Sequence, residues 1–143
     1  MVIDRIVIAL LMMFLCTIIH AVFMIGANHT VERRLTRFGP IRGQFGRAVL
    51  IWLLTLWMFL AIVIEAWLWA LVYLFHSAIT VIPDPETAFY FSMVTYTTLG
   101  YGDVTLTGQW RTLASIQAAN GVIIFGWTTA LIFYYIQKLY KKD

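Results

Sequence analysis

Charged residues are scarce in this chain. They make up 12% of its 143 residues, whereas 62% of the residues are hydrophobic. A soluble domain of this length usually has about twice that charged fraction. The mean hydropathy of +0.83 points the same way. The composition therefore excludes an ordinary soluble protein and predicts an integral membrane protein.

Groups that carry out covalent or metal chemistry are also rare. The single cysteine, Cys16, cannot form an intrachain disulfide and gives no metal-site spacing, so we expect a small buried side chain. The histidines are dispersed at His20, His29 and His76. Because no Cys/His, Ser/His or metal-ligand cluster is found in the sequence, we expect neither an enzyme nor a cofactor, and no nucleic-acid partner.

Three long apolar runs are present, at residues 6–27, 48–76 and 112–136. With about 22, 30 and 25 residues, each is long enough to cross roughly 30 Å of hydrocarbon as a helix. The first run is preceded by Asp4 and Arg5, whose charges cancel, so it lacks the positive start of a signal peptide. We therefore predict an all-α membrane protein with three transmembrane helices, the first one retained.

Basic residues gather at two places between and after these runs. Residues 28–47 contain five arginines and one acid, Glu32, and lysines follow the third run. Short loops rich in Lys and Arg stay in the cytoplasm. We expect residues 28–47 and the C-terminus in the cytoplasm, the N-terminus outside, and the plasma (cell inner) membrane as the location. The basic residues are Arg33, Arg34, Arg37, Arg42, Arg47, Lys138, Lys141 and Lys142.

Two readings of residues 28–47, which include the basic linker from Arg33 to Arg47, remain open. Val31, Leu35 and Phe38 would share one helical face, which is typical of a short helix lying on the membrane and touching anionic head groups. Gly39-Pro40 would end that helix. A solvated basic loop without a lipid role fits the composition equally well.

A short helix is predicted at residues 85–97. Asp84 is a typical N-cap, followed by proline at the first helical position and Glu86 in the first turn. About four turns are too few to cross a bilayer, so we expect a re-entrant helix whose C-terminal, negative end points to the membrane centre. Such a turn inside the membrane needs protein or water around its backbone.

Two glycines flank one aromatic directly after this helix, in the stretch Thr97 to Asp103. Gly100 and Gly102 can take positive φ angles that other residues avoid. Alternation of such residues with ordinary ones lets successive carbonyls face one side, where their oxygens can replace the water around a cation.

The stretch Thr98-Leu99-Gly100-Tyr101-Gly102 resembles the selectivity filter of potassium channels, with Asp103 at the position of the acid that follows it. The resemblance implies that K⁺ is bound by the Thr98 hydroxyl and by the carbonyls of Thr98, Leu99, Gly100 and Tyr101. The Leu99 and Tyr101 side chains would face away from the pore and pack behind it.

Several residues depart from the usual pattern of that family. Leu99 stands where Val or Ile is usual, and Val94 stands where some relatives have a glutamate, so Asp103 is expected to lack a carboxyl partner. Tyr90 and Phe91 replace two tryptophans, and we expect their aromatic packing around the filter to persist. The residues expected to support the filter are Tyr90, Phe91, Val94, Thr97, Asp103 and Glu65.

Polar side chains inside the apolar runs are expected to bond to neighbouring helices. Glu65 would lie near the level of the re-entrant helix, where Ser92, Thr95 or Tyr96 could donate to it. A structural tie is favoured over a gating or proton-sensing role. The same reasoning favours interhelical hydrogen bonds for His20, Gln117 and Asn120.

The third run has a face of residues spaced by three and four: Ala118, Val122, Phe125, Thr129 and Phe133. By resemblance this face lines the cavity below the filter, Gly121 matches the hinge glycine of inner helices, and Gly126 is a second hinge. Phe125 or Phe133, repeated around a pore, would form an apolar gate. A helix-packing stripe with glycines for close approach is an open alternative for each residue.

One filter segment per chain, without an internal repeat, predicts a homotetramer around one axis. We expect residues 1–47 to form a transmembrane helix and basic linker, and residues 48–143 a two-helix pore module, with the first helix on the lipid side. The resemblance implies passive, potassium-selective conduction. A non-selective cation channel, or a non-conducting accessory or sensor protein of the same fold, is the alternative.

Overall fold

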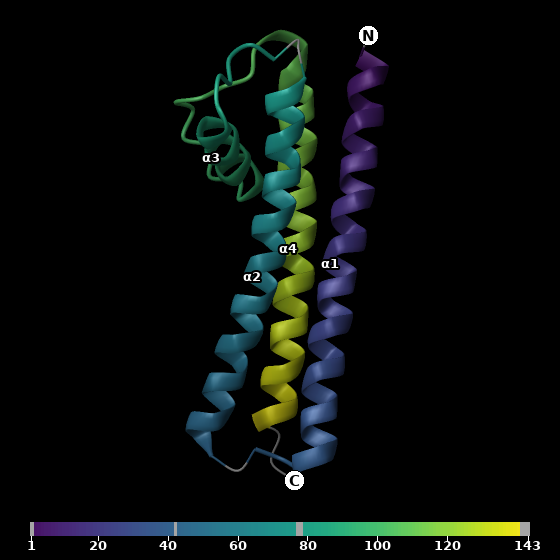
Figure 1. Ribbon diagram of the computed structural model, residues 1–143, viewed down its shortest axis with the longest axis vertical. Coiled ribbons are helices and arrows are strands. Elements are labelled where there is room, and N and C mark those ends of the chain that lie inside the picture. Colours follow the sequence, from purple (N-terminus) through teal and green to yellow (C-terminus); the bar gives the residue numbers. More distant parts are fainter. Residues whose placement is uncertain (1, 42, 77–78, 141–143) are drawn as a thin grey trace.

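The chain folds into long helices with one short helix beside them. The computed structural model describes residues 2–41, 43–76 and 79–140. In chain order the helices are α1 (Val2–Phe38), α2 (Gln44–Phe75), α3 (Pro85–Tyr96) and α4 (Arg111–Tyr140), and a 3₁₀ turn, η1 (Gly108–Trp110), precedes α4. No strand occurs within these residues, so the all-α class is confirmed (Figure 1).

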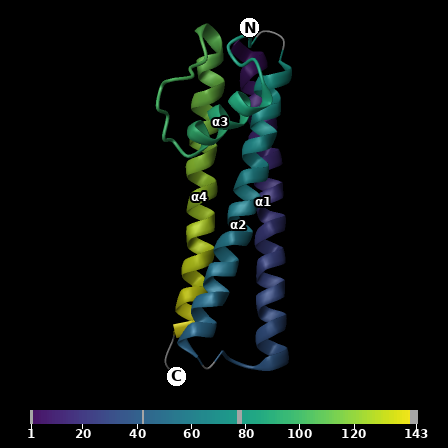
Figure 2. The ribbon, with the colours of Figure 1, turned by 60° about the vertical axis from the view of Figure 1, so that its left-hand side comes forward.

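Three of these helices are long and apolar enough to cross a membrane: Ile3–Phe38, Gln44–Phe75 and Arg111–Tyr140. They run in alternating directions, so that the N-terminus and α3 lie at one end of the molecule (Figures 1 and 2). The connection between α1 and α2 and the end of α4 lie at the other. The protein is therefore an integral membrane protein. Arg42, Lys141 and Lys142 lie outside the described residues.

Both alternatives for the segment after residue 27, a separate surface helix and a solvated loop, are wrong as far as Phe38. α1 continues without a break to Phe38, and the chain turns only at Gly39, whose φ is +74°. Val31 is buried against Leu54 and Tyr135, and Leu35 packs on the same cluster. The apolar face of this segment thus packs on α2 and α4, which extends the helix beyond the apolar run instead of laying it on the membrane.

Side-chain contacts fasten the start of α1 to η1 and the end of α1 to α4. Near the N-terminus, the Arg5 guanidinium lies 4.8 Å from the centre of the Trp110 ring. Near the other end, Lys138 donates to Glu32, the one acid of the basic segment. α1 therefore packs along α2 and α4, on the side of the molecule away from α3 (Figures 1 and 2).

The start of α3 is as predicted. The Asp84 carboxylate accepts hydrogen bonds from the Thr87 backbone N–H at 2.9 Å and from the Thr87 hydroxyl at 2.7 Å. These bonds hold the pKa of Asp84 below its ordinary value. Proline occupies the first turn, where its missing N–H would have no helical partner anyway. α3 spans 12 residues and ends at Tyr96, one residue before the predicted end.

α3 sits in an angle between α2 and α4, and its far end almost touches the α4 backbone. A Cβ built on Gly121 would lie 1.9 Å from the carbonyl oxygen of Tyr96. Only glycine fits at this point. Gly121 therefore allows close approach of α3 and α4, as the helix-packing alternative predicted. By contrast, a Cβ at Gly126 would meet nothing within 4 Å.

We predict that Gly121→Ala destabilises the fold by about 1–3 kcal/mol, because its methyl group would overlap a backbone atom that cannot turn aside. Gly126→Ala is the matched control in the same helix; with open space around it, the gain in helix propensity of roughly 1 kcal/mol makes it neutral or stabilising. Thermal unfolding of the two variants in detergent measures the difference. Equal melting temperatures would contradict the packing at Gly121.

Candidate functional site

The loop after α3 has an alternating backbone. Thr98, Gly100 and Gly102 have positive φ angles of 59°, 48° and 83°, whereas the residues between them do not. The two glycines take the conformation that the sequence predicted. Thr98 is the exception, because a β-branched residue with positive φ is an outlier that costs about 1–3 kcal/mol and is found where the surroundings impose it.

Hydrogen bonds to the end of α3 impose this conformation. The Thr98 N–H donates to the Thr95 carbonyl at 2.9 Å, and the Gly100 N–H donates to the Val94 carbonyl at 3.0 Å. The Thr97 hydroxyl donates to the Met93 carbonyl at 2.8 Å. The Val94 and Thr95 carbonyls have no partner within the helix, so the loop satisfies them as it leaves α3.

The side chains of the loop have little to pack against in a single chain. Leu99 is 55% exposed and Tyr101 is 68% exposed. Beside the loop lies a cavity of about 530 Å³ between α3, the returning segment and the start of α4. The packing behind the filter that the resemblance implies for Leu99 and Tyr101 is therefore not supplied by their own chain.

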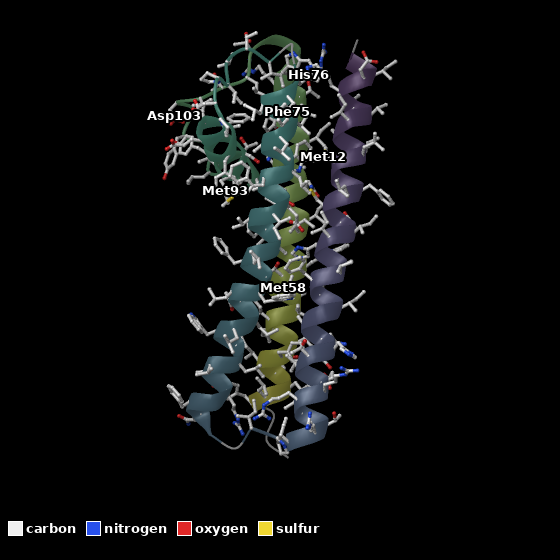
Figure 3. The ribbon with its side chains drawn as sticks, viewed as in Figure 1. Met12, Met58, Phe75, His76, Met93 and Asp103 are labelled. Carbon is white, nitrogen blue, oxygen red and sulfur yellow. The ribbon has the colours of Figure 1, made fainter. Side chains whose placement is uncertain are left out.

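Asp103, which follows Gly102 at the end of the loop, has a partner that the sequence did not reveal. The Tyr90 hydroxyl donates to its carboxylate at 2.6 Å (Figure 3 labels Asp103). This bond lowers the pKa of Asp103 and raises that of Tyr90. Val94 is a buried apolar side chain, as its residue type suggests. A phenol thus bonds the acid that was expected to lack a carboxyl partner.

Phe91 and the adjacent serine lock α3 onto the long helices. The Phe91 ring meets Tyr73 edge-on at 5.0 Å. Ser92 donates to the Ala66 carbonyl at 2.6 Å, and Gln117 donates to the Ser92 hydroxyl at 2.8 Å while accepting from Tyr73 at 2.6 Å. The interhelical role predicted for Gln117 is confirmed.

Glu65 is fully buried and joins all three long helices to α3. Tyr96 donates to Glu65 Oε2 at 3.0 Å, and His20 Nδ1 lies 3.1 Å from Glu65 Oε1. The other ring nitrogen of His20 lies 3.1 Å from the Thr128 hydroxyl of α4. The structural ties predicted for Glu65 and His20 are confirmed; of the three donors named for Glu65, Tyr96 makes the bond.

The prediction for Asn120 is wrong, although its side chain is fully buried. Its Oδ1 and Nδ2 have no hydrogen-bond partner among the described residues. The groups facing it include the Cys16 thiol, which is a weak partner at best. Cys16 itself is buried, as expected for a small apolar side chain.

The face predicted to line a cavity is largely open in the single chain. Val122 and Phe133 are 59% and 57% exposed, and Thr129 is exposed with its hydroxyl bonded to the Phe125 carbonyl of its own helix. Phe125 is partly buried beside Tyr96. These residues, with the exposed Gly126, follow one side of α4 below the loop.

We predict that Tyr90→Phe raises the pKa of Asp103 towards its ordinary value, because the hydroxyl that favours the charged carboxylate is lost. A carboxylate with a lowered pKa in the folded state stabilises the fold above the unfolded-state pKa, and this contribution disappears as pH falls through the folded value. NMR titration of the Asp103 carboxyl checks the shift. Phe89→Leu, which removes no hydroxyl, should leave it unchanged; an unaltered titration in Tyr90→Phe would contradict the contact.

Comparison with known proteins identifies the family. No curated protein and no solved structure matches the chain significantly. A family model described as "Ion channel" matches residues 52–138, which is more than half of the chain and includes most of α2, all of α3, the loop and nearly all of α4. The family is one of channels, not of enzymes. The protein therefore belongs to this ion channel family.

Proposed function

We propose that the protein is a potassium-selective channel that conducts passively through a homotetrameric pore. The observation that carries the proposal is the alternation of positive φ at Thr98, Gly100 and Gly102. Alternate peptide orientations are what a row of inward-facing carbonyls requires. In the proposed filter, the carbonyls of Thr98, Leu99, Gly100 and Tyr101 and the Thr98 hydroxyl replace the water around K⁺.

Four chains around one axis are proposed because one loop cannot surround an ion. The exposed Leu99 and Tyr101 and the cavity beside the loop support this assembly, since neighbouring copies would supply the missing surfaces. α1 lies on the side of the chain away from α3, which suits a position facing lipid outside the pore. Closed cyclic symmetry is the usual solution for such head-to-tail contacts.

The rest of the conduction path follows from the placement of α3 and α4. The C-terminal end of α3 carries the negative end of its dipole, which favours a cation beneath the filter. We propose that Val122, Phe125, Thr129 and Phe133 line the cavity there. Gly126 is the better candidate for a hinge, because Gly121 is required for contact with α3.

The orientation proposed for the channel places the filter near the outer surface. The connection between α1 and α2 and the end of α4 share one end of the molecule with Arg33, Arg34 and Lys138, which suits the cytoplasmic side. α3 and the N-terminus then lie towards the outside. Residues 48–143 form the pore module in this scheme, and residues 1–47 form a helix that braces it.

We predict that the protein reconstituted in planar bilayers gives currents that reverse close to the potassium equilibrium potential under opposed Na⁺ and K⁺ gradients. The filter carbonyls replace the hydration shell of K⁺ more favourably than that of Na⁺, which is the physical reason for rejecting Na⁺. Barium, a divalent ion of similar size, should block. A reversal potential near zero would indicate a non-selective cation channel, and no current would indicate an accessory protein.

We predict that Gly100→Ala abolishes potassium selectivity, because a Cβ opposes the positive φ at this position. Gly39→Ala is the matched control: its φ of +74° is equally unfavourable for alanine, and it also has nothing within 4 Å of the added methyl group. Reversal potentials of both variants separate the two effects. Equal loss of selectivity in Gly39→Ala would attribute the result to general destabilisation.

A further inference from the structure

A groove lies along the contact between α1 and α2, in the half of the molecule away from α3. Its volume is about 330 Å³, at the lower end of the range for small-ligand sites of about 300–1,000 Å³. Gly26, Thr30 and Val31 line it from α1, and Leu50, Leu53 and Trp57 line it from α2. Met58, labelled in Figure 3, is the buried neighbour of Trp57 on α2.

The walls of the groove offer hydrocarbon surface. The two polar side chains in it are already satisfied: the Thr30 hydroxyl donates to the Gly26 carbonyl at 2.8 Å, and the Trp57 indole N–H donates to the Phe23 carbonyl at 3.0 Å. Gly26 keeps the groove open, since a Cβ there would reach ordinary contact with Trp57 at 3.7 Å. An apolar chain fits these walls, whereas a polar ligand would find no partners.

Positive charge lies directly beyond one end of the groove. Arg33, Arg34 and Arg37 lie seven, eight and eleven residues after Gly26, and three, four and seven residues after Thr30. At these helical spacings the arginines lie on the same side of α1 as the two groove residues, over the last turns of the helix. Arg33 and Arg37 are exposed. Arg34 uses one N–H for the Gly39 carbonyl at 3.1 Å, and a guanidinium has four more to donate.

Within the described residues, Arg33, Arg34 and Arg37 form no ion pair with an acid. Glu32 is bonded to Lys138. α2 begins at this end with Gly43 as its N-cap, without a side-chain cap and without an acid in its first turn. The combination of a hydrocarbon-lined groove and uncompensated arginines at its end matches a molecule with an apolar tail and an anionic head.

We propose that this groove binds an anionic phospholipid, with one acyl chain between α1 and α2 and the phosphate beside Arg33, Arg34 and Arg37. The site goes beyond ion conduction and lies outside the proposed pore. A neutral phospholipid can also place a chain in the groove, so the arginines give the site its preference for an anionic head. The contact with anionic lipid that was one alternative for this basic segment is thus assigned to one site on α1 and α2. The site has two parts that can be tested separately, the apolar groove and the three arginines.

Native mass spectrometry of the full-length protein, titrated in detergent with phosphatidylglycerol or phosphatidylcholine of the same acyl chains, tests the proposal. We expect phosphatidylglycerol to bind several-fold more tightly than phosphatidylcholine. Arg33→Gln/Arg37→Gln should reduce this preference by about fivefold for each arginine. Arg111→Gln, which removes one charge at the other end of the molecule, should leave it unchanged.

The groove is tested separately with Gly26→Leu, which adds a bulky apolar side chain to its wall at a position whose Cβ would meet only the Trp57 ring, at 3.7 Å. We expect this variant to lose binding of both lipids several-fold, while Thr55→Leu, an exposed position of α2 outside the groove, binds as the unaltered chain does. Equal affinity for the two lipids, or an arginine effect without an effect of Gly26→Leu, would overturn the site. If the double variant does not fold, Arg37→Gln alone carries the charge test.

The binding measurement does not depend on conduction. A chain that binds phosphatidylglycerol as described but carries no current would refute the proposed function and leave the lipid site intact. A selective channel that does not discriminate between the two lipids would refute the lipid site alone.

Discussion

The C-terminal end of α3 is the constraint on which the structure depends. The end of a helix leaves its last carbonyls without helical partners, and each of them that is buried needs another donor. The chain solves this locally, because the amides of Thr98 and Gly100 return to carbonyls of the last turn. α4 can approach the same end only where it carries Gly121. The alternating loop and the helix behind it are two consequences of one requirement.

A buried carboxylate holds this arrangement together from the side. Glu65 bonds to Tyr96, the last residue of α3, and to His20, which also reaches Thr128. Removal of one partner from a buried hydrogen bond typically costs about 1–3 kcal/mol, because the remaining group keeps its desolvation penalty. The Glu65–His20 pair therefore serves mainly to fix the relative positions of the four helices, and it contributes less to net stability.

Local chemistry made some of these features predictable and others not. The Asp84 cap, the glycine positions of the loop and the three apolar spans depend on residues close in sequence, and each is found where it was expected. The continuation of α1 depends on Val31 meeting Leu54 and Tyr135, residues of two other helices. Two other features depend on the path of the chain in space, which residue type alone does not encode: the bond between Tyr90 and Asp103, and the lack of a partner for Asn120 among the described residues.

The contact between His20 and Glu65 also determines what can be removed from this protein. Residues 48–143 look like a self-sufficient module along the sequence, yet one of their carboxylates is completed by a side chain from the preceding helix. A chain shortened to that module would insert an acid into the bilayer with half of its bonding missing. Although α1 lies on the side of the chain away from α3, it is for this reason needed to complete the hydrogen bonding of the buried Glu65.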